Sequence, residues 1–343
     1  TSNVVVGNTA GDSLQSGGNY NVLVGDSAGT ATTTGDNNTA VGFSALSANT
    51  TGTNNVALGS SALLVNTTGS YNAAVGMVAL DANIDGDANT ALGYGALSDN
   101  TTADNNTAVG YFALLRNTTG ANNIAIGAGA LDANTTASNN TVVGKDAATA
   151  NTTGDGMTAM GFGALANNTT AANNTAVGYI AMISNTTGAN NTAVGSLALD
   201  ANTTASNNTA VGYQALTANT TGIRNTAIGY QTLASNVSGN YNIAIGQTAL
   251  NKNTTSNNTA IGYNSQEETT SGGNNTSLGY QALQLNTSGT QNTAVGSGAL
   301  DANTTASNCS AFGYNALGSN TTGASNVGIG QFSLDANTTG ASN

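Results

Sequence analysis

Apolar and polar residues recur along this chain with a period of 17 positions. Each copy is a variant of Asn-Thr-Ala-Val-Gly-Tyr-x-Ala-Leu-x-x-Asn-Thr-Thr-Gly-x-x, and the first glycine of a copy is called here its phase glycine. The phase glycines are Gly7, Gly25, Gly42, Gly59, Gly76, Gly93, Gly110, Gly127, Gly144, Gly161, Gly178, Gly195, Gly212, Gly229, Gly246, Gly262, Gly279, Gly296, Gly313 and Gly330. Their spacing is 17 residues except for one step of 18, from Gly7 to Gly25, and one of 16, from Gly246 to Gly262. A short fixed period is typical of stacked coils and predicts a solenoid.

The repeat continues through the whole chain, so residues 1–343 are interpreted as one continuous array of about twenty coils. Two segments are less regular. The copies in 1–37 are degenerate, and the coil at 263–273 lacks the Ala-Leu pair and carries adjacent acids at Glu267 and Glu268. We interpret this second segment as a local defect that follows the one-residue deletion.

One regular copy, residues 208–224, shows how a coil is predicted to form. Residues 208–212 alternate, with Thr209 and Val211 on one side, as expected of a short strand. A turn leads to a second short strand at 215–219, and the Thr-Thr-Gly segment then closes the coil as a return loop. Recurring Asn, Gly and β-branched residues argue against a helix. The predicted fold is therefore all-β, a parallel β-solenoid (β-roll).

Stacking explains why only 6% of the residues are charged. Coils about 4.8 Å apart place each residue over its equivalent, so a charge at a fixed position would become a column of like charges. Asn at four positions before the phase glycine, as at Asn208, avoids this repulsion and is expected to form an amide ladder. A second Asn column lies seven positions after the glycine, as at Asn219. Twenty coils would give a rod of roughly 90 Å.

The apolar columns predict self-association. Ala210 and Val211 face opposite sides of one predicted strand, and Ala215 and Leu216 face opposite sides of the other. A thin roll hides only one side of each strand, so an Ala and Leu-type column would remain as an exposed apolar stripe. The simplest arrangement that covers such a stripe is several parallel chains around a common axis.

The net charge is −12, and the only cations are Lys145, Lys252, Arg116 and Arg224. This balance argues against nucleic acid and anionic membrane surfaces as partners. No run approaches the ~18 apolar residues of a membrane-spanning segment, so no membrane insertion is expected. The chain begins within a repeat, so we expect any secretion signal to be absent or already removed. It stops at Asn343, in the phase where another copy could begin, which predicts a longer fibre or end-to-end stacking.

No catalytic, metal or cofactor site is predicted. The chain has no His, and its acids are scattered through unrelated coils. The single cysteine, Cys309, stands in an Asn column and is interpreted as a small residue tolerated there. Residues 83–89 place oxygen ligands at alternating positions, as a calcium loop would, but the segment occurs once and lacks a closing Glu. A solvated turn is favoured.

Asn-x-Ser/Thr sequons recur in phase in the return loop, which is expected to face solvent. The candidate glycosylation sites are Asn49, Asn66, Asn117, Asn134, Asn202, Asn219 and Asn320. Glycosylation would place sugars along one edge of the array, and without it the loop is a plain polar surface. The Thr-Thr pairs in this loop also suggest ice binding as a candidate function. Adjacent residues of a strand point to opposite faces, however, so the pairs do not form the flat array that ice binding needs.

Tyrosine often follows the phase glycine directly. It does so at Tyr94, Tyr111, Tyr179, Tyr213, Tyr230, Tyr263, Tyr280 and Tyr314. Two interpretations stay open, an aromatic strip that stacks on sugars and a turn residue that packs on its neighbours.

Copies such as Asn-Ile-Ala-Ile-Gly at 123–127 and Asn-Thr-Ala-Ile-Gly at 225–229 carry a resemblance. The repeat resembles that of trimeric autotransporter adhesin heads, where Ser/Asn-x-Ala-Ile/Val-Gly-x-x-Ala recurs in a left-handed parallel β-roll. It is also similar to repeats of some phage tail-fibre and bacterial surface proteins. The resemblance covers nearly the whole chain and implies a trimer of slender rolls. The period here is longer, and that family's neck, coiled-coil stalk and membrane anchor are missing, which leaves the anchoring open.

The expected function is that of a non-enzymatic extracellular fibre on a cell surface or virion, used for surface attachment or spacing. The expected partner is the chain itself, as a homotrimer or an end-to-end filament, with surface glycans or matrix proteins as further candidates. The alternative is a self-assembling, glycosylated filament or matrix subunit. A carbohydrate-active solenoid of the tailspike kind would need site chemistry that the sequence lacks.

Overall fold

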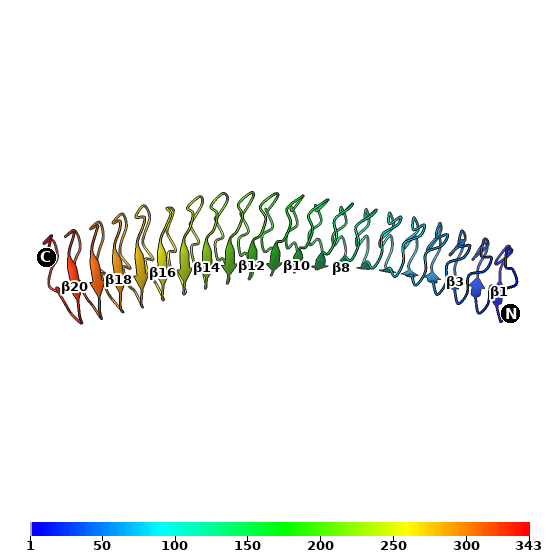
Figure 1. The fold of residues 1–343 in the computed structure, drawn as a ribbon, viewed down its shortest axis with the longest axis horizontal. Coiled ribbons are helices and arrows are strands. Elements are labelled where there is room, and N and C mark those ends of the chain that lie inside the picture. The colour runs from blue at the N-terminus through cyan, green and yellow to red at the C-terminus, as the bar shows by residue number, and fades with distance from the viewer. Residues whose placement is uncertain (1) are drawn as a thin grey trace. The chain divides into compact units, whose positions relative to one another are not determined.

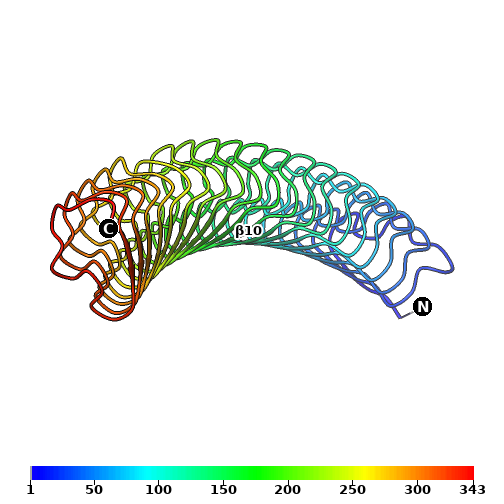
Figure 2. The same cartoon turned by 60° about the vertical axis from the view of Figure 1, so that its left-hand side comes forward.

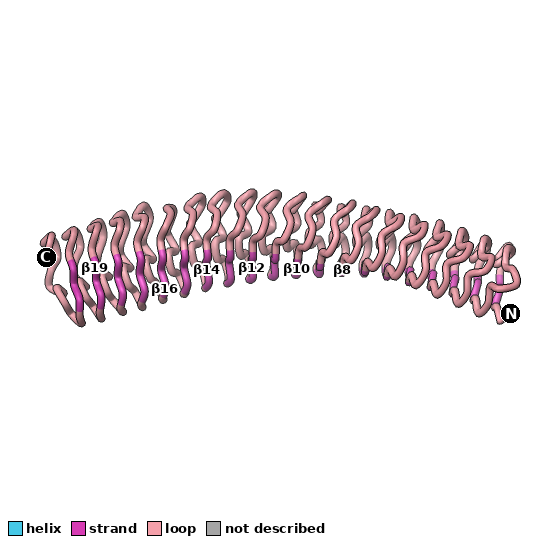
Figure 3. The backbone as a smooth tube through the Cα atoms, in the orientation of Figure 1, coloured by secondary structure: helices cyan, strands magenta, loops and turns pink. Residues whose placement is uncertain are grey.

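The computed structural model describes residues 2–343 and confirms the predicted fold, an all-β parallel β-solenoid with no helix in that range. Each coil contributes one three-residue strand, and the other residues form turns and loops (Figure 3). The chain divides into two compact units, one up to Asn173 and one from Asn174 onward. The two units follow the same plan.

Twenty strands, some of them labelled in Figure 1, mark the twenty copies of the repeat. The strands of the first unit are β1 (Val4–Val6), β2 (Val22–Val24), β3 (Thr39–Val41), β4 (Val56–Leu58), β5 (Ala73–Val75), β6 (Thr90–Leu92), β7 (Thr107–Val109), β8 (Ile124–Ile126), β9 (Thr141–Val143) and β10 (Thr158–Met160). Those of the second unit are β11 (Thr175–Val177), β12 (Thr192–Val194), β13 (Thr209–Val211), β14 (Thr226–Ile228), β15 (Ile243–Ile245), β16 (Thr259–Ile261), β17 (Thr276–Leu278), β18 (Thr293–Val295), β19 (Ser310–Phe312) and β20 (Val327–Ile329).

Within each unit every strand pairs in parallel with the next, and equal positions of the repeat lie opposite each other. Between β12 and β13, for example, Val194 pairs with Val211. Figure 2 shows the coils of each unit following one another as similar backbone loops. The predicted columns of equivalent side chains are therefore present.

The second strand predicted in each coil is wrong. In the copy at 208–224, residues 213–218 form turns, and Gln214 and Leu216 have φ angles of 55° and 54°. A left-handed residue at every second position breaks an extended strand. Hydrogen bonds between coils continue without it, since the Leu216 amide donates to the Thr232 carbonyl at 3.0 Å.

The same turn changes where the apolar side chains lie. Ala215 and Leu216 are both fully buried, together with Ala210 in the middle of the strand. The left-handed conformation at Leu216 turns its side chain to the inside, whereas an extended strand would have pointed Ala and Leu to opposite sides. The predicted Ala and Leu-type exposed stripe is therefore wrong, because these residues form the core of a single chain.

The phase glycines close this core where the strand enters the turn. Gly212 has a φ of +134°, which L residues rarely adopt, and a Cβ there would lie 2.4 Å from the carbonyl oxygen of Gly229 in the next coil. Glycine is thus required both for the backbone angle and for the close approach of successive coils.

Candidate functional surfaces

The Asn column four positions before the phase glycine is buried and bonds mainly to backbone. The Asn208 amide nitrogen Nδ2 donates to the Gly222 carbonyl at 2.9 Å, and the backbone N–H of Asn208 donates to Oδ1 of Asn191 in the preceding coil at 2.9 Å. The amide ladder predicted for this column is therefore replaced by side-chain bonds that tie each strand start to its neighbour. Both functional groups of the amide are used inside the stack.

The Asn column seven positions after the phase glycine forms the amide ladder. Nδ2 of Asn202 donates to Oδ1 of Asn185 at 2.7 Å and to the Ala205 carbonyl at 3.0 Å, and Nδ2 of Asn219 donates to Oδ1 of Asn202 at 3.2 Å. This column contains all seven candidate glycosylation sites, and each of their side chains is fully buried. The expectation that these asparagines face solvent is wrong, because their amides are the internal bonds of the stack. Glycosylation itself stays a prediction.

A different sequon column is exposed. Asparagine five positions before the phase glycine begins an Asn-Asn-Thr or Asn-Cys-Ser sequon in many coils, and its side chain points to solvent from a left-handed backbone. These residues are Asn37, Asn105, Asn139, Asn173, Asn190, Asn207, Asn257, Asn274 and Asn308. The Asn-x-Ser/Thr rule matches both columns equally, so only burial separates them.

The two threonines of the return loop differ in the same way. The first bonds to the next coil, as Thr118 Oγ1 donates to the Thr135 carbonyl at 3.0 Å. The second, as at Thr204 and Thr221, is exposed. The pair therefore supplies one structural hydroxyl and one solvated hydroxyl per coil.

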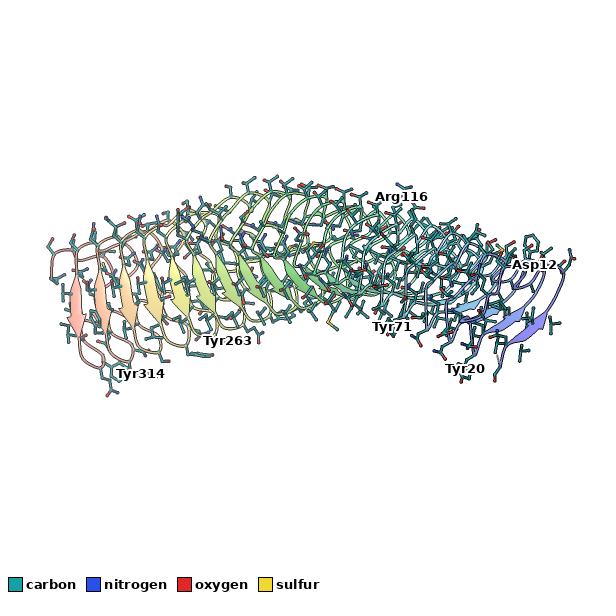
Figure 4. All side chains as sticks on the ribbon, turned by 45° about the vertical axis from the view of Figure 1, so that its right-hand side comes forward. Asp12, Tyr20, Tyr71, Arg116, Tyr263 and Tyr314 are labelled. Carbon is teal, nitrogen blue, oxygen red and sulfur yellow. The ribbon has the colours of Figure 1, made fainter. Side chains whose placement is uncertain are left out.

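The tyrosines after the phase glycines stack on one another where neighbouring coils both carry one. The ring centroids of Tyr213 and Tyr230 are 5.6 Å apart with planes at 17°, and those of Tyr263 and Tyr280 are 5.4 Å apart at 10°. Figure 4 shows Tyr263 and Tyr314 projecting from the turn beyond the strand. The packing interpretation is confirmed for these pairs, whose facing ring surfaces are covered, and sugar binding stays a prediction.

Aspartates five positions after a phase glycine have no Asp or Glu at the same position in the neighbouring coils. Where the next coil offers a hydroxyl, the carboxylate accepts from it: Ser98 Oγ bonds to Asp81 at 2.5 Å and Thr217 Oγ1 bonds to Asp200 at 2.6 Å. Asp301 faces Gly318 instead. Partial burial raises the pKa of the Asp81 and Asp301 carboxyl groups above its ordinary range, and at Asp81 the nearby Asp99 charge adds to this rise.

The irregular coil at 263–273 buries polar groups where other coils bury Ala and Leu. Gln266 Nε2 donates to Ser277 Oγ and to the Thr259 carbonyl, both at 2.8 Å, and Ser265 also bonds to Ser277. Within residues 2–343, the buried Oε1 of Gln266 has no hydrogen-bond partner.

The two acids of this coil point to different partners. Glu268 forms an ion pair with Lys252, with Nζ and Oε2 2.6 Å apart, and this contact raises the pKa of Lys252. Glu267 accepts from Gln284 Nε2 at 2.9 Å. The two carboxylates of this coil therefore bond to different partners.

Cys309 fits its Asn column as a small buried residue. Its backbone N–H donates to Asn292 Oδ1 at 3.0 Å, and Sγ lies 3.3 Å from the Gly323 carbonyl oxygen, where the Asn of other coils donates. Burial raises the pKa of the Cys309 thiol, so it stays protonated at neutral pH.

The described residues, 2–343, contain no pocket and no group of three or more His, Cys, Asp or Glu side chains that could hold a metal ion. No helix in this range is long and apolar enough to cross a membrane. In the calcium-like segment, Asn83 and Asn89 are buried in the two Asn columns, so their oxygens lie inside the coil. No protein-family model and no curated protein matches the chain. The surfaces left for function are the outer side of the strands, the aromatic column and the exposed Asn and Thr of the loops.

Proposed function

We propose that this chain is a non-enzymatic extracellular fibrous protein, an adhesin-head or tail-fibre-like β-roll rod that attaches to or spaces surfaces on a cell or virion. The observation that carries this proposal is the uniform bonding between coils. In each regular coil the Asn amides, one Thr hydroxyl and much of the backbone form hydrogen bonds to the neighbouring coils, as at Asn202 and Thr118. Such a stack suits a mechanical or presenting role.

The resemblance of the repeat to trimeric autotransporter adhesin heads and phage tail-fibre repeats supports the same proposal. It favours a homotrimer of rolls and an adhesive role toward surface glycans or matrix proteins. The exposed aromatic column, with Tyr213 and Tyr230, and the solvated loop threonines would be the surfaces available for such contacts.

A second candidate is a self-assembling, glycosylated filament or matrix subunit. The exposed Asn-Asn-Thr sequons, as at Asn105 and Asn207, favour it because a sugar there would not disturb either buried Asn column. Intact mass of protein from a glycosylating host tests this candidate, with Asn105→Gln and Asn207→Gln removing two attachment points. An unmodified mass would exclude it in that host.

Negative-stain imaging with sedimentation of the purified chain tests the main proposal. We expect discrete slender particles of roughly 90 Å, by the coil-spacing estimate. Endless filaments would favour the second candidate, and compact globular particles would contradict both. Adhesion is tested by coating beads with the protein and measuring their capture on glycan and matrix-protein surfaces, with uncoated beads as control.

A further inference from the structure

The outer side of the strands carries an apolar column that the core does not use. The first and third residues of each strand point outward, and we call these positions together the strand face. The third position is Val, Ile, Leu, Met or Phe in all twenty strands, although its side chains are partly or largely exposed. Leu58, Leu92 and Leu278, for example, are 47%, 47% and 48% exposed.

Strand propensity does not explain this column. Thr is β-branched and suits a strand as Val does, and the first position is Thr in twelve strands and Ser in one. The third position, on the same side of the strand, is never polar, and Leu58, Met160 and Phe312 there are not β-branched. Exposed loop positions in the same coils, such as Thr204 and Thr221, are polar. The third position is therefore selected for apolar contact.

The area of the strand face follows from the strand spacing. Ten strands about 4.8 Å apart give a length of roughly 43 Å in each unit, and two side chains about 6.7 Å apart along a strand give a width of roughly 10 Å. Each unit thus offers on the order of 400 Å², about half of the ~800 Å² per partner of a standard interface.

The regular spacing of the coils favours a second solenoid as the partner of the strand face. A globular partner meets this face over a few coils only, whereas a second parallel solenoid with the same rise meets it at every coil. The face also carries no charge, since none of the forty outward strand positions is Asp, Glu, Lys or Arg. The acids that give the chain its charge of −12 lie in turns and loops, as at Asp81 and Asp200, so no charged side chain is buried when the strand face is covered.

We propose that the strand face packs against the strand face of a second copy of this chain, sheet on sheet. The inference rests on the proposed fibre and names the side through which its copies associate. The sequence alone predicts that the copies associate through the Ala and Leu stripe, which is buried in each chain. The contact surface proposed here is the outward column that includes Val177, Val211 and Val295. The exposed Asn and Thr of the loops then stay free for solvent.

Charge substitution on two sides of the same coils tests this proposal. The variant Val177→Glu, Val211→Glu, Val295→Glu places carboxylates on the strand face in coils that are not adjacent. The control Thr187→Glu, Thr221→Glu, Thr305→Glu adds the same charge at exposed loop positions of the same coils. We expect sedimentation equilibrium to show an associated wild type, an associated control and a strand-face variant whose association is at least about 100-fold weaker, because burying unpaired carboxylates is costly.

Circular dichroism and hydrogen exchange of the Asn columns show whether each variant keeps the fold. If the Glu variant does not fold, Val177→Thr, Val211→Thr, Val295→Thr keeps the β-branched shape and should still weaken association roughly tenfold or more. Equal association of wild type and a folded strand-face variant would overturn the proposal, and so would equal weakening of the loop control. A wild type that stays monomeric at all concentrations would also overturn it, while slender monomers in images would leave the proposed fibre standing.

Discussion

Asparagine at two positions of the repeat supplies both a hydrogen-bond donor and a hydrogen-bond acceptor with one side chain. An amide can donate and accept at once, so in a parallel stack it bonds to the coil on either side without adding charge. Asn202 uses Nδ2 toward Asn185 and Ala205 and receives a bond from Asn219 on its oxygen. Aspartate there would have no donor, and alanine would leave neighbouring amides without partners inside the stack.

Asn202→Ala is expected to lower the free energy of unfolding by about 2–4 kcal/mol. The substitution removes hydrogen bonds and leaves buried amide groups of both adjacent coils without a partner. Urea denaturation followed by circular dichroism measures this loss. The matched control is Thr204→Ala, two residues away and exposed, for which we expect a change within about 0.5 kcal/mol. Equal effects of the two substitutions would mean that the ladder contributes little.

The pH dependence of stability has a defined sign at Asp301. Partial burial raises the pKa of this carboxyl in the folded chain above its ordinary value of about 3.9, so the folded state binds the proton more tightly than the unfolded state. The free energy of unfolding therefore gains from this group as the pH falls through the raised pKa, and the gain is complete below about 3.9.

Asp301→Asn removes this titration. We expect the variant to be more stable than the wild type at pH 7, with the difference shrinking as the pH is lowered through the raised pKa. Urea midpoints across this range provide the measurement. A variant that is less stable than the wild type at neutral pH would show that the carboxylate is stabilised by its surroundings instead.

At the scale of the coil, one short strand is enough to hold the stack together because the turns also form backbone hydrogen bonds to the neighbouring coils. Leu216 adopts a left-handed conformation that costs roughly 1–2 kcal/mol. Full burial of a leucine side chain offsets this with about 1.5–3 kcal/mol. The same conformation recurs at the equivalent leucines of other coils, so the turn is a regular part of the coil.

The irregular coil shows what happens when this plan is broken. Ser265 and Gln266 replace the Ala-Leu pair, Ser277 replaces a strand alanine, and Thr269 takes the ladder position. The buried Oδ1 of Asn236 has no hydrogen-bond partner within residues 2–343, and Asn236 lies in the coil that precedes the one-residue deletion between Gly246 and Gly262. We expect the lowest hydrogen-exchange protection of the second unit's inner coils at this place.

The variant Ser265→Ala, Gln266→Leu, Ser277→Ala restores the apolar core of a regular coil. It is expected to raise the free energy of unfolding by about 1–3 kcal/mol, since it removes a buried unsatisfied oxygen and adds apolar contact. Thermal unfolding and hydrogen exchange of the neighbouring coils are the measurements. Gln247→Leu, on an exposed position, is the control and should change stability by less than about 0.5 kcal/mol. A loss of stability in the triple variant would show that the polar cluster is favourable as it stands.

At the scale of the molecule, charge and apolar surface act in opposite directions. The chain carries −12, so copies repel each other over the range of a Debye length, while the strand face favours their contact. Raising the ionic strength from about 0.01 M to about 0.15 M shortens that length from about 30 Å to about 8 Å. We therefore expect salt to strengthen self-association.

Sedimentation equilibrium across this salt range checks the expectation. The loop control, Thr187→Glu, Thr221→Glu, Thr305→Glu, carries three more negative charges and should respond more steeply to salt than the wild type. Association that weakens with salt would instead indicate that ion pairs hold the copies together, contrary to an uncharged strand face.

The sequence by itself determined the period, the parallel register and the columns, because a side chain repeated every 17 residues must lie beside its own copy in any regular stack. It also located the defect near residues 263–273, since a break in the pattern is visible without coordinates. Only the tertiary structure decided which side of each column is inside. The reason is the left-handed turn at residues such as Gln214 and Leu216, which are not glycine and give no local signal of it. That turn buries the Ala-Leu pair, so the third strand position, as at Val211, is the apolar column that stays on the outside.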